Sequence, residues 1–227
     1  MTIKNRLAYE SGLLLDDQYF PGSIARRRCR VWEEHVRPLN EFAATVASEE
    51  HEHVPWFDPD SGGVESRVLL LLQDPSSAAA YGSRIISRHN NDRTAGNTLA
   101  AAEEAGLSYG QSVHWNVIPW WVQDPSKAPA PGKKRSLAAE ARRAARYLGE
   151  ALGILGGLDT VVLVGRRAQS AWDQAAAVNP WFGQRIRVLR CPHTSQQAWN
   201  NRDKRSGRRN SEMTVETFTD AARSSSQ

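Results

Sequence analysis

The sequence of 227 residues contains little cysteine and no long apolar run. Its two cysteines, Cys29 and Cys191, lie far apart, which excludes a four-cysteine zinc or iron–sulfur site within this chain and fits a reducing compartment. No apolar run approaches the roughly 18 residues of a membrane-spanning helix, and residues 1–17 lack the pattern of a secretion signal. A G-x-S-x-G motif is also missing, which argues against an α/β-hydrolase. We therefore expect a cytoplasmic protein without a membrane partner.

Composition and charge favour one globular domain with an anionic partner. The chain is 40% hydrophobic, which at this length is enough for one well-buried core. Its formal net charge is +4, its isoelectric point is near 9.3, and its arginines occur in clusters. Clustered positive charge suggests binding to an anionic molecule.

One buried strand presents a carboxylate at its end. Residues 68–72 are five consecutive apolar residues, the length of a strand buried on both faces, and Gln73, Asp74 and Pro75 follow directly. Proline cannot continue a ladder, so the strand ends here. Asp74 is then either a turn and capping residue or a functional carboxylate at the edge of a sheet.

Further apolar runs alternate with helical patterns along the chain. This alternation predicts an α/β fold, a three-layer sandwich with a central four-stranded parallel sheet flanked by helices. Residues 24–36 and a segment after Pro38 also have helical periodicity. We expect a helical segment over residues 1–53 packed on the core, the α/β domain over residues 54–200, and a basic, partly flexible segment over residues 201–227. The expected later strands are 112–119, 160–165 and 187–191, and the expected helices between them are 98–105, 136–155 and 168–178.

Polar residues follow three of the four expected strands. They are Asp74, Asn116 and His193, which are remote from one another in sequence. Because the carboxyl ends of parallel strands meet at one edge of a sheet, we expect these three side chains to lie together. The polar segment from residue 76 to 97 is long for a connection in a compact domain, which favours a functional role for it as well.

These residues resemble the motifs of the uracil-DNA glycosylase superfamily. In that superfamily the first strand ends in a Gly-Gln-Asp-Pro-type motif, and residues 72–75 match it except for the leading glycine. The last strand ends in a His-Pro-Ser-type motif, which residues 193–195 match with Thr194 in place of proline. Asn116 closes the second strand, as the pyrimidine-reading asparagine of the family does. The resemblance covers residues 54–200.

The resemblance implies a role for each of these residues. Asp74 would orient or deprotonate the attacking water and stabilise the cationic sugar, and His193 would donate a hydrogen bond to the pyrimidine O2, helped by the backbone amide of Gln73. Asn116 would pair with the O4 and N3–H edge of uracil, or in another orientation with a cytosine-like edge. The base must first flip out of the helix. Neither a metal nor another cofactor is implied.

Two departures from the family concern the base pocket. Ser76 stands where the most uracil-specific members have a tyrosine that blocks the thymine methyl, which predicts a wider and more polar pocket. No aromatic residue occurs between residues 85 and 91, where the family stacks a ring on the base. His89 is the nearest substitute, and Tyr81 lies upstream.

The residues after His193 are candidates for DNA contact. Where other members place a wedge in the vacated base stack, this chain has Gln197, with Trp199 close by; Trp199 is either the wedge or a packing residue under the loop. A dense basic run follows, which is either a solvated tail or a phosphate-binding segment. Its residues are Arg202, Lys204, Arg205, Arg208 and Arg209.

The sequence therefore predicts a monomeric, monofunctional DNA glycosylase that removes uracil or a modified pyrimidine from DNA. Two alternatives remain at this stage. One is an enzyme of the same fold that removes bulky modified pyrimidines from phage DNA, which would serve antiviral defence rather than base-excision repair. The other is a nucleic-acid-binding module that keeps the fold without catalysis.

Overall fold

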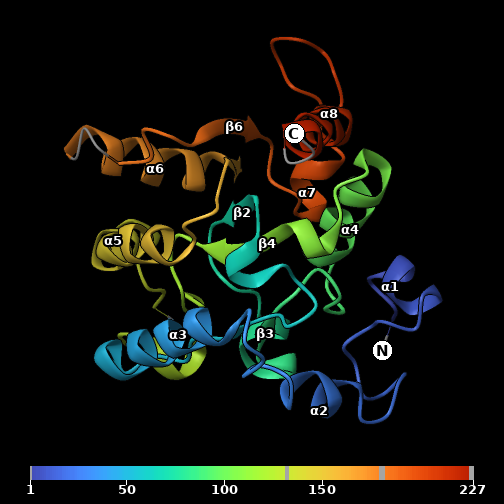
Figure 1. Cartoon of the computed structure of the whole chain (residues 1–227), viewed down its shortest axis with the longest axis vertical. Coiled ribbons are helices and arrows are strands. Elements are labelled where there is room, and N and C mark those ends of the chain that lie inside the picture. Colours follow the sequence, from blue (N-terminus) through green and yellow to red (C-terminus); the bar gives the residue numbers. More distant parts are fainter. Residues whose placement is uncertain (1, 131–132, 179–181, 225–227) are drawn as a thin grey trace.

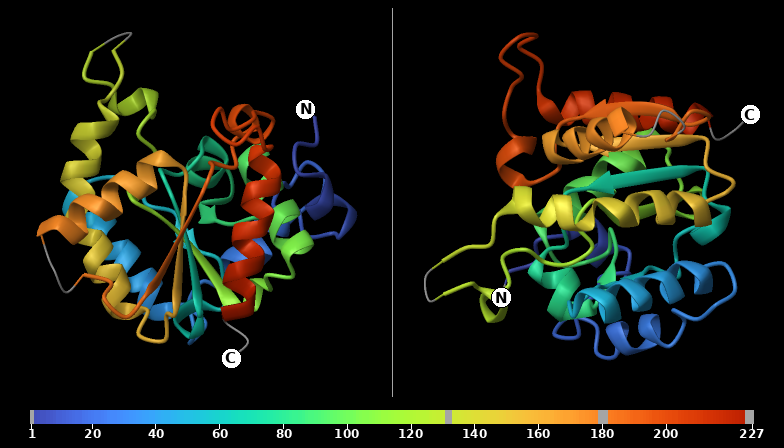
Figure 2. Two further views of the ribbon diagram at one scale, coloured as in Figure 1. Left: turned by 90° about the horizontal axis from the view of Figure 1, so that it is seen from above. Right: turned by 90° about the vertical axis from the view of Figure 1, so that its left-hand side faces the viewer.

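The computed structural model of the chain describes residues 2–130, 133–178 and 182–224; Pro131 and Gly132 of the proline-rich loop lie outside them. The core is a parallel four-stranded sheet in the order β4 (Ser112–Asn116), β2 (Val68–Leu72), β5 (Thr160–Val164) and β6 (Arg187–Cys191) (Figure 1). Helices cover both faces of this sheet (Figure 2), as the alternation of strands and helices predicted. The fold is thus the expected three-layer α/β sandwich.

The four strands coincide with the apolar runs of the sequence. They are β2 (Val68–Leu72), β4 (Ser112–Asn116), β5 (Thr160–Val164) and β6 (Arg187–Cys191). In the register of β2 and β4, Leu72 lies opposite Asn116, so both strands end at the same level. β2 lies between β4 and β5, which explains its continuous apolar sequence.

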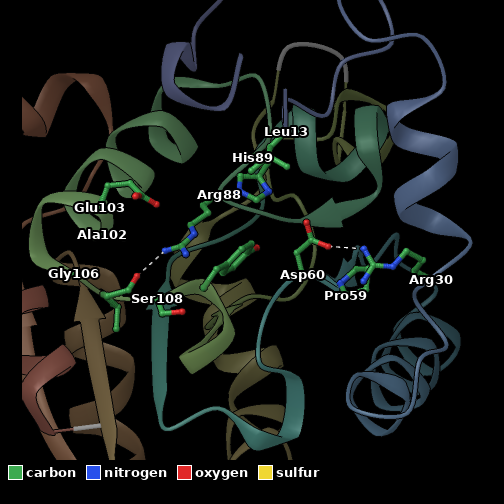
Figure 3. Close-up of a pocket in the computed structure, with 12 residues that line it drawn as sticks. Leu13, Arg30, Pro59, Asp60, Arg88, His89, Ala102, Glu103, Gly106 and Ser108 are labelled. Atoms are coloured by element: carbon green, nitrogen blue, oxygen red, sulfur yellow. Dashed lines mark hydrogen bonds and ion pairs between the residues drawn. The ribbon is translucent and has the colours of Figure 1, made fainter. Parts of the chain in front are cut away.

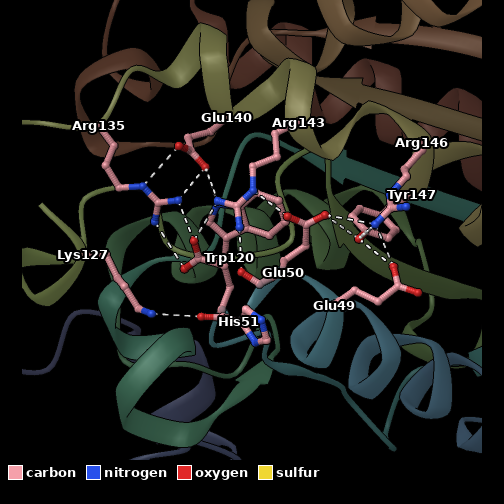
Figure 4. A network of polar contacts seen from close by, with 11 residues as sticks. Glu49, Glu50, His51, Trp120, Lys127, Arg135, Glu140, Arg143, Arg146 and Tyr147 are labelled. Carbon is pink, nitrogen blue, oxygen red and sulfur yellow. Dashed lines mark hydrogen bonds and ion pairs between the residues drawn. The ribbon is translucent and has the colours of Figure 1, made fainter. Parts of the chain in front are cut away.

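Three helices cover one face of the sheet, namely α3 (Arg37–Glu50), α5 (Leu137–Ile154) and α6 (Arg166–Val178). As predicted from the sequence, the α5 helix begins after Ser136, whose side chain accepts a hydrogen bond from Ala139 N. Ion pairs between arginines of α5 and glutamates at the end of α3 join the two helices (Figure 4). Arg135, which is nearly buried, bonds both Glu52 and Glu140 at 2.6 Å.

Two helices cover the other face, namely α4 (Arg93–Ala105) and α8 (Asn210–Ser224). The α4 helix begins five residues before the expected position, because Asp92 accepts a hydrogen bond from Ala95 N and caps it. The α8 helix lies in the segment expected to be basic and partly flexible. It buries Thr214, Phe218 and Ala221 against the sheet layer, so this part of the segment belongs to the core.

The N-terminal part contains α1 (Arg6–Glu10) and α2 (Ser23–Arg28). The prediction of a helix over residues 24–36 is wrong beyond residue 28. Asn40 donates a hydrogen bond from Nδ2 to Val31 O at 2.7 Å, and Arg27 turns inward to an ion pair with Asp58. These tertiary contacts hold residues 29–36 in turns.

Short elements complete the chain. β1 (Trp56–Phe57) and β3 (Ile85–Ile86) form a separate parallel pair. The remaining elements are the 3-10 helices η1 (Gly63–Glu65), η3 (Tyr109–Gln111) and η4 (Pro125–Lys127), the π-helix η2 (Ala78–Ser83) and the single turn α7 (Gln196–Trp199). Within the described ranges, no helix has both the length and the apolar character needed to span a membrane.

Candidate active site

The polar residues at the strand ends share one pocket, as predicted. A cavity of about 290 Å³ lies beyond the carboxyl ends of β2 and β4, and the loop after β6 closes one side of it. Asp74, Asn116 and His193 all line it, together with Gln73 and Ser76. The parallel sheet therefore brings together residues that are up to 119 positions apart in the chain.

Asp74 is held in a fixed orientation on the pocket wall. Its Oδ1 accepts a hydrogen bond from Gln73 Nε2 at 2.8 Å, and its Oδ2 accepts one from Val122 N at 3.2 Å. Burial raises the pKa of the Asp74 carboxyl above its usual value, and the two hydrogen bonds partly oppose this shift. A carboxylate with a raised pKa is a stronger proton acceptor, which suits a general base.

His193 presents an N–H group to the pocket. Its Nδ1 accepts a hydrogen bond from Ser195 N at 2.9 Å, which places the proton of the neutral ring on Nε2. Burial lowers the pKa of His193 below its usual value, so the ring is neutral at neutral pH. Nε2–H is therefore a hydrogen-bond donor that does not carry a positive charge.

The loop that carries His193 is anchored on both sides. The hydroxyl of Thr194 lies 2.8 Å from Thr98 Oγ1 on α4. Asn97 Nδ2 donates a hydrogen bond to Thr194 O, also at 2.8 Å. On the other side, Gly165 has a φ of +89°, and a Cβ atom there would lie 2.8 Å from His193 Cβ. Only glycine leaves room for the ring in this position.

Asn116 offers a free amide donor. The residue is 4% exposed, and its Nδ2 has no hydrogen-bond partner among the described residues. Buried polar groups nearly always have a partner, so a free one in a pocket is suited to a ligand. An amide here can donate to a carbonyl oxygen such as O4 of uracil.

Other residues of the pocket were not singled out from the sequence. Arg88 and Asn90 belong to the polar segment predicted to be functional, but the sequence does not show which of its side chains face inward. His114 lies two positions before Asn116 on the same face of β4, so strand alternation would have identified it. Trp121 also lines the pocket and is the aromatic residue among its described lining side chains. No sequence pattern distinguishes it from the neighbouring Trp120.

His89 lies outside the pocket, so the expectation that it contacts the base does not fit this geometry. Its ring meets Tyr109 edge-on, with centroids 5.2 Å apart, and its Nδ1 lies 3.4 Å from Arg27 Nη1. It lines a neighbouring open cavity of about 720 Å³, and Arg88 lines both this cavity and the candidate pocket (Figure 3). The alternative, Tyr81, is 51% exposed, stacks on His53 and meets Trp121 edge-on.

Ser76, a candidate base-binding residue from the sequence, lines the pocket. Its hydroxyl donates a hydrogen bond to Asp92 Oδ2 at 2.9 Å. Burial raises the pKa of Asp92 above its usual value. Asp92 and Asn90 also line the pocket, so polar side chains surround Ser76 there.

The candidate DNA contacts lie in and after α7. Gln197 is exposed there, whereas Trp199 packs against the apolar cluster of the sheet and α8, which favours the packing role over the wedge. The backbones of Arg202 and Arg209 form an antiparallel β-bridge. This bridge closes a hairpin that projects from the body of the protein between α7 and α8 (Figure 2). Lys204 and Arg205 are exposed in this hairpin.

Neither a metal centre nor a known relative provides an identification. In the part of the chain that the structure describes, no group of three or more histidine, cysteine, aspartate or glutamate side chains is placed to hold a metal ion. A scan against models of known protein families finds no match. A search of curated proteins finds no match either. The pocket geometry is therefore the basis for assigning a function.

Proposed function

We propose that the protein is a DNA glycosylase that hydrolyses the N-glycosidic bond of a flipped-out pyrimidine in DNA. The observation that carries the proposal is the convergence of three groups in one pocket at the strand ends, namely the buried Asp74 carboxyl, the neutral His193 ring and the free Asn116 amide. These are the groups that the similarity to uracil-DNA glycosylases predicted for base excision.

The arrangement suits the charges that develop when the bond breaks. The bond between the sugar C1′ and the pyrimidine N1 breaks so that its electron pair stays on the base, and the sugar becomes cationic. His193 Nε2–H donates to O2 of the departing base and stabilises its negative charge. Asp74 stabilises the cationic sugar and accepts a proton from the water that adds to C1′.

The surrounding residues keep these groups in place. Gln73 uses its side chain to hold Asp74, and its carbonyl oxygen accepts a hydrogen bond from Ile118 N at 3.0 Å. Asn116 reads the polar edge of the base, and Trp121 supplies the aromatic wall. A base inside a double helix cannot reach this buried site, so it must flip out.

The basic hairpin fits a role in holding the DNA backbone. Lys204 and Arg205 follow the histidine loop within a dozen residues and are exposed to solvent. Contacts of this kind bind phosphate without reading sequence. We propose that the protein acts as a monomer in the cytoplasm, where its two free cysteines would stay reduced.

The test is to measure free bases released from DNA by mass spectrometry. The panel contains uracil in single strands, base pairs and mismatches, and phage DNA with modified pyrimidines. We expect release by the wild type and a loss of at least about 100-fold in Asp74→Asn. Asp173→Asn is the matched control, because Asp173 lies on the surface in an ion pair with Arg190 and should leave release unchanged. Absence of release from every DNA would overturn the proposal.

A further inference from the structure

An apolar groove of about 520 Å³ lies between α5 and α6, two helices that cover the same face of the sheet (Figure 1). Its floor contains Val117 and Ile118, which follow β4 and are buried. Its walls are mostly small or apolar side chains of the two helices, namely Leu137, Ala138, Ala141, Ala145, Ala171 and Ala175. Among the described residues, only Gln73 lines both this groove and the candidate pocket. The reaction proposed above therefore assigns no role to the groove.

The groove exposes apolar surface that the fold does not cover. Monomeric proteins rarely expose a large contiguous apolar patch, and one that is edged by polar residues marks a site of interaction. Val178, at the end of α6, lines the groove and is 85% exposed despite its apolar side chain. Phe182 lines the groove as well and is only partly buried. We therefore expect a partner with an apolar surface of its own.

The shape of the groove fits a row of side chains. Its lining residues on α5 run from Leu137 to Gly149 and those on α6 from Arg167 to Val178, so at 1.5 Å per residue the groove is about 17 Å long. Spread over this length, the volume gives a mean cross-section of about 30 Å². This is too narrow for a whole helix, whose diameter is about 10 Å, but wide enough for apolar side chains. About three turns of an amphipathic helix fit along it, with the side chains i, i+4, i+7 and i+11 in the groove.

Positive charge borders the groove on both sides. Arg142 on α5 and Arg167 on α6 line it, and neither bonds a carboxylate among the described residues. Arg143 and Arg146, by contrast, are bonded to glutamates at the end of α3 (Figure 4). None of the described residues that line the groove is acidic. The groove therefore complements a segment in which aspartate or glutamate flanks the apolar row.

The placement of the arginines favours a peptide over other anions. An acyl chain has a single charged head, so it needs positive charge at one end of the groove. Here Arg142 and Arg167 stand on opposite walls, where acidic side chains on the two flanks of a helix would meet them. A DNA duplex would contact the arginines through its phosphates and leave the apolar floor uncovered.

We infer that the groove between α5 and α6 docks an acidic amphipathic helix of a partner protein. About three turns of this helix place an apolar row over Val117 and Ile118, and carboxylates on its flanks pair with Arg142 and Arg167. The inference goes beyond the proposed glycosylase function and does not depend on it.

The experiment measures the binding of fluorescein-labelled peptides to the protein by fluorescence anisotropy. The first peptide has about 14 residues, leucine at positions i, i+4, i+7 and i+11, glutamate on both flanks, and a lactam bridge on its outer face that keeps it helical. A second peptide carries lysine in place of glutamate, and a third has the same composition with the leucines out of register. We expect a Kd of about 10 µM or lower for the first peptide and binding at least about tenfold weaker for the other two.

Variants of the protein show where the peptide binds. Ala145→Trp fills the groove and should weaken binding of the first peptide by at least about tenfold, whereas Ala139→Trp, at an exposed position of α5 outside the groove, should not. Arg142→Glu and Arg167→Glu should each weaken it by at least about tenfold as well. Arg166→Glu is the matched control, because Arg166 is exposed beside Arg167 and does not line the groove. Thermal melting checks that each variant is folded.

Three results would overturn the docking inference. One is equal binding of all three peptides, and another is unchanged binding of the first peptide by folded Ala145→Trp and Arg142→Glu. The third is absence of peptide binding by the wild type together with weaker duplex binding by Arg142→Glu and Arg167→Glu, which would assign these arginines to DNA. Each of these results leaves the proposed function untouched, because base release is measured separately.

Discussion

Replacing Gly165 with alanine tests whether the position of His193 controls the reaction. The new Cβ atom would lie 2.8 Å from both Cβ and Cδ2 of His193, which is too close for the ring to stay where it is. The backbone φ of +89° adds strain for any residue with a side chain, about 1–2 kcal/mol. Crowding against the histidine adds about 1–3 kcal/mol. The variant should therefore lose about 2–5 kcal/mol of stability.

The effect on catalysis should exceed that of general destabilisation. A displaced His193 no longer aims Nε2–H at the departing base, and loss of one such donor costs about 10²–10³ in kcat. Gly106→Ala is the matched control, because Gly106 has a φ of +68° and open space where its Cβ would lie. Its stability should fall through backbone strain alone, with kcat unchanged.

The assay is single-turnover base release, measured at a temperature where urea unfolding shows both variants to be folded. We expect Gly165→Ala to be at least about 100-fold slower than wild type and Gly106→Ala to stay within about threefold. Release by folded Gly165→Ala at the wild-type rate would refute the reasoning, because the histidine would then not need its observed position.

Three further predictions concern stability and DNA affinity. Arg135→Ala removes one of the two arginines that bond both Glu52 and Glu140, and Arg143 remains, so the free energy of unfolding should fall by about 1–3 kcal/mol. Arg6→Ala, at an exposed ion pair, should leave the free energy of unfolding unchanged in urea unfolding. His114 has a pKa of about 3 in the folded state against 6.5 ordinarily, so only the unfolded chain gains this proton as pH falls below 6.5. This group should therefore lower the free energy of unfolding by up to about 1.4 kcal/mol for each pH unit below 6.5. Between pH 7 and pH 5 the free energy of unfolding of His114→Phe should fall less steeply with pH than that of the wild type, and equal pH slopes would contradict this. Lys204→Ala with Arg205→Ala should reduce the slope of log affinity against log salt by about 1.8 for duplex DNA, with Arg6→Ala as the unchanged control in fluorescence anisotropy.

Much of the fold could be predicted because its signals are local. Each strand is a short apolar run, and the helix after Ser136 has both a cap and a regular apolar face. The meeting of Asp74, Asn116 and His193 then follows from parallel topology alone. The spacing of Thr214, Phe218 and Ala221 also indicates a helix with one buried face, which became α8. The basic residues before this helix suggested a flexible charged segment instead.

The contribution of Arg88 and Asn90 to the pocket lining could not be predicted from local patterns. Arg88 and Asn90 face the cavity while His89 between them does not, and this alternation depends on hydrogen bonds from Asn5, more than eighty residues earlier. The same kind of long-range contact ended the predicted helix after residue 28, where Arg27 pairs with Asp58. Contacts between distant segments leave no periodic signal in the sequence.

The most direct test of the glycosylase assignment measures DNA affinity and base release on the same sample of Asp74→Ala. The account predicts that affinity for the substrate DNA stays within about threefold of wild type, while single-turnover release falls by about 10²–10⁴. Release by this variant at the wild-type rate would contradict the account, because Asp92, the other carboxyl group that lines the pocket, already accepts hydrogen bonds from Ser76 Oγ and from Ala95 N at the start of α4. DNA binding by the wild type without release of any base would contradict it equally, and would identify a binding module instead.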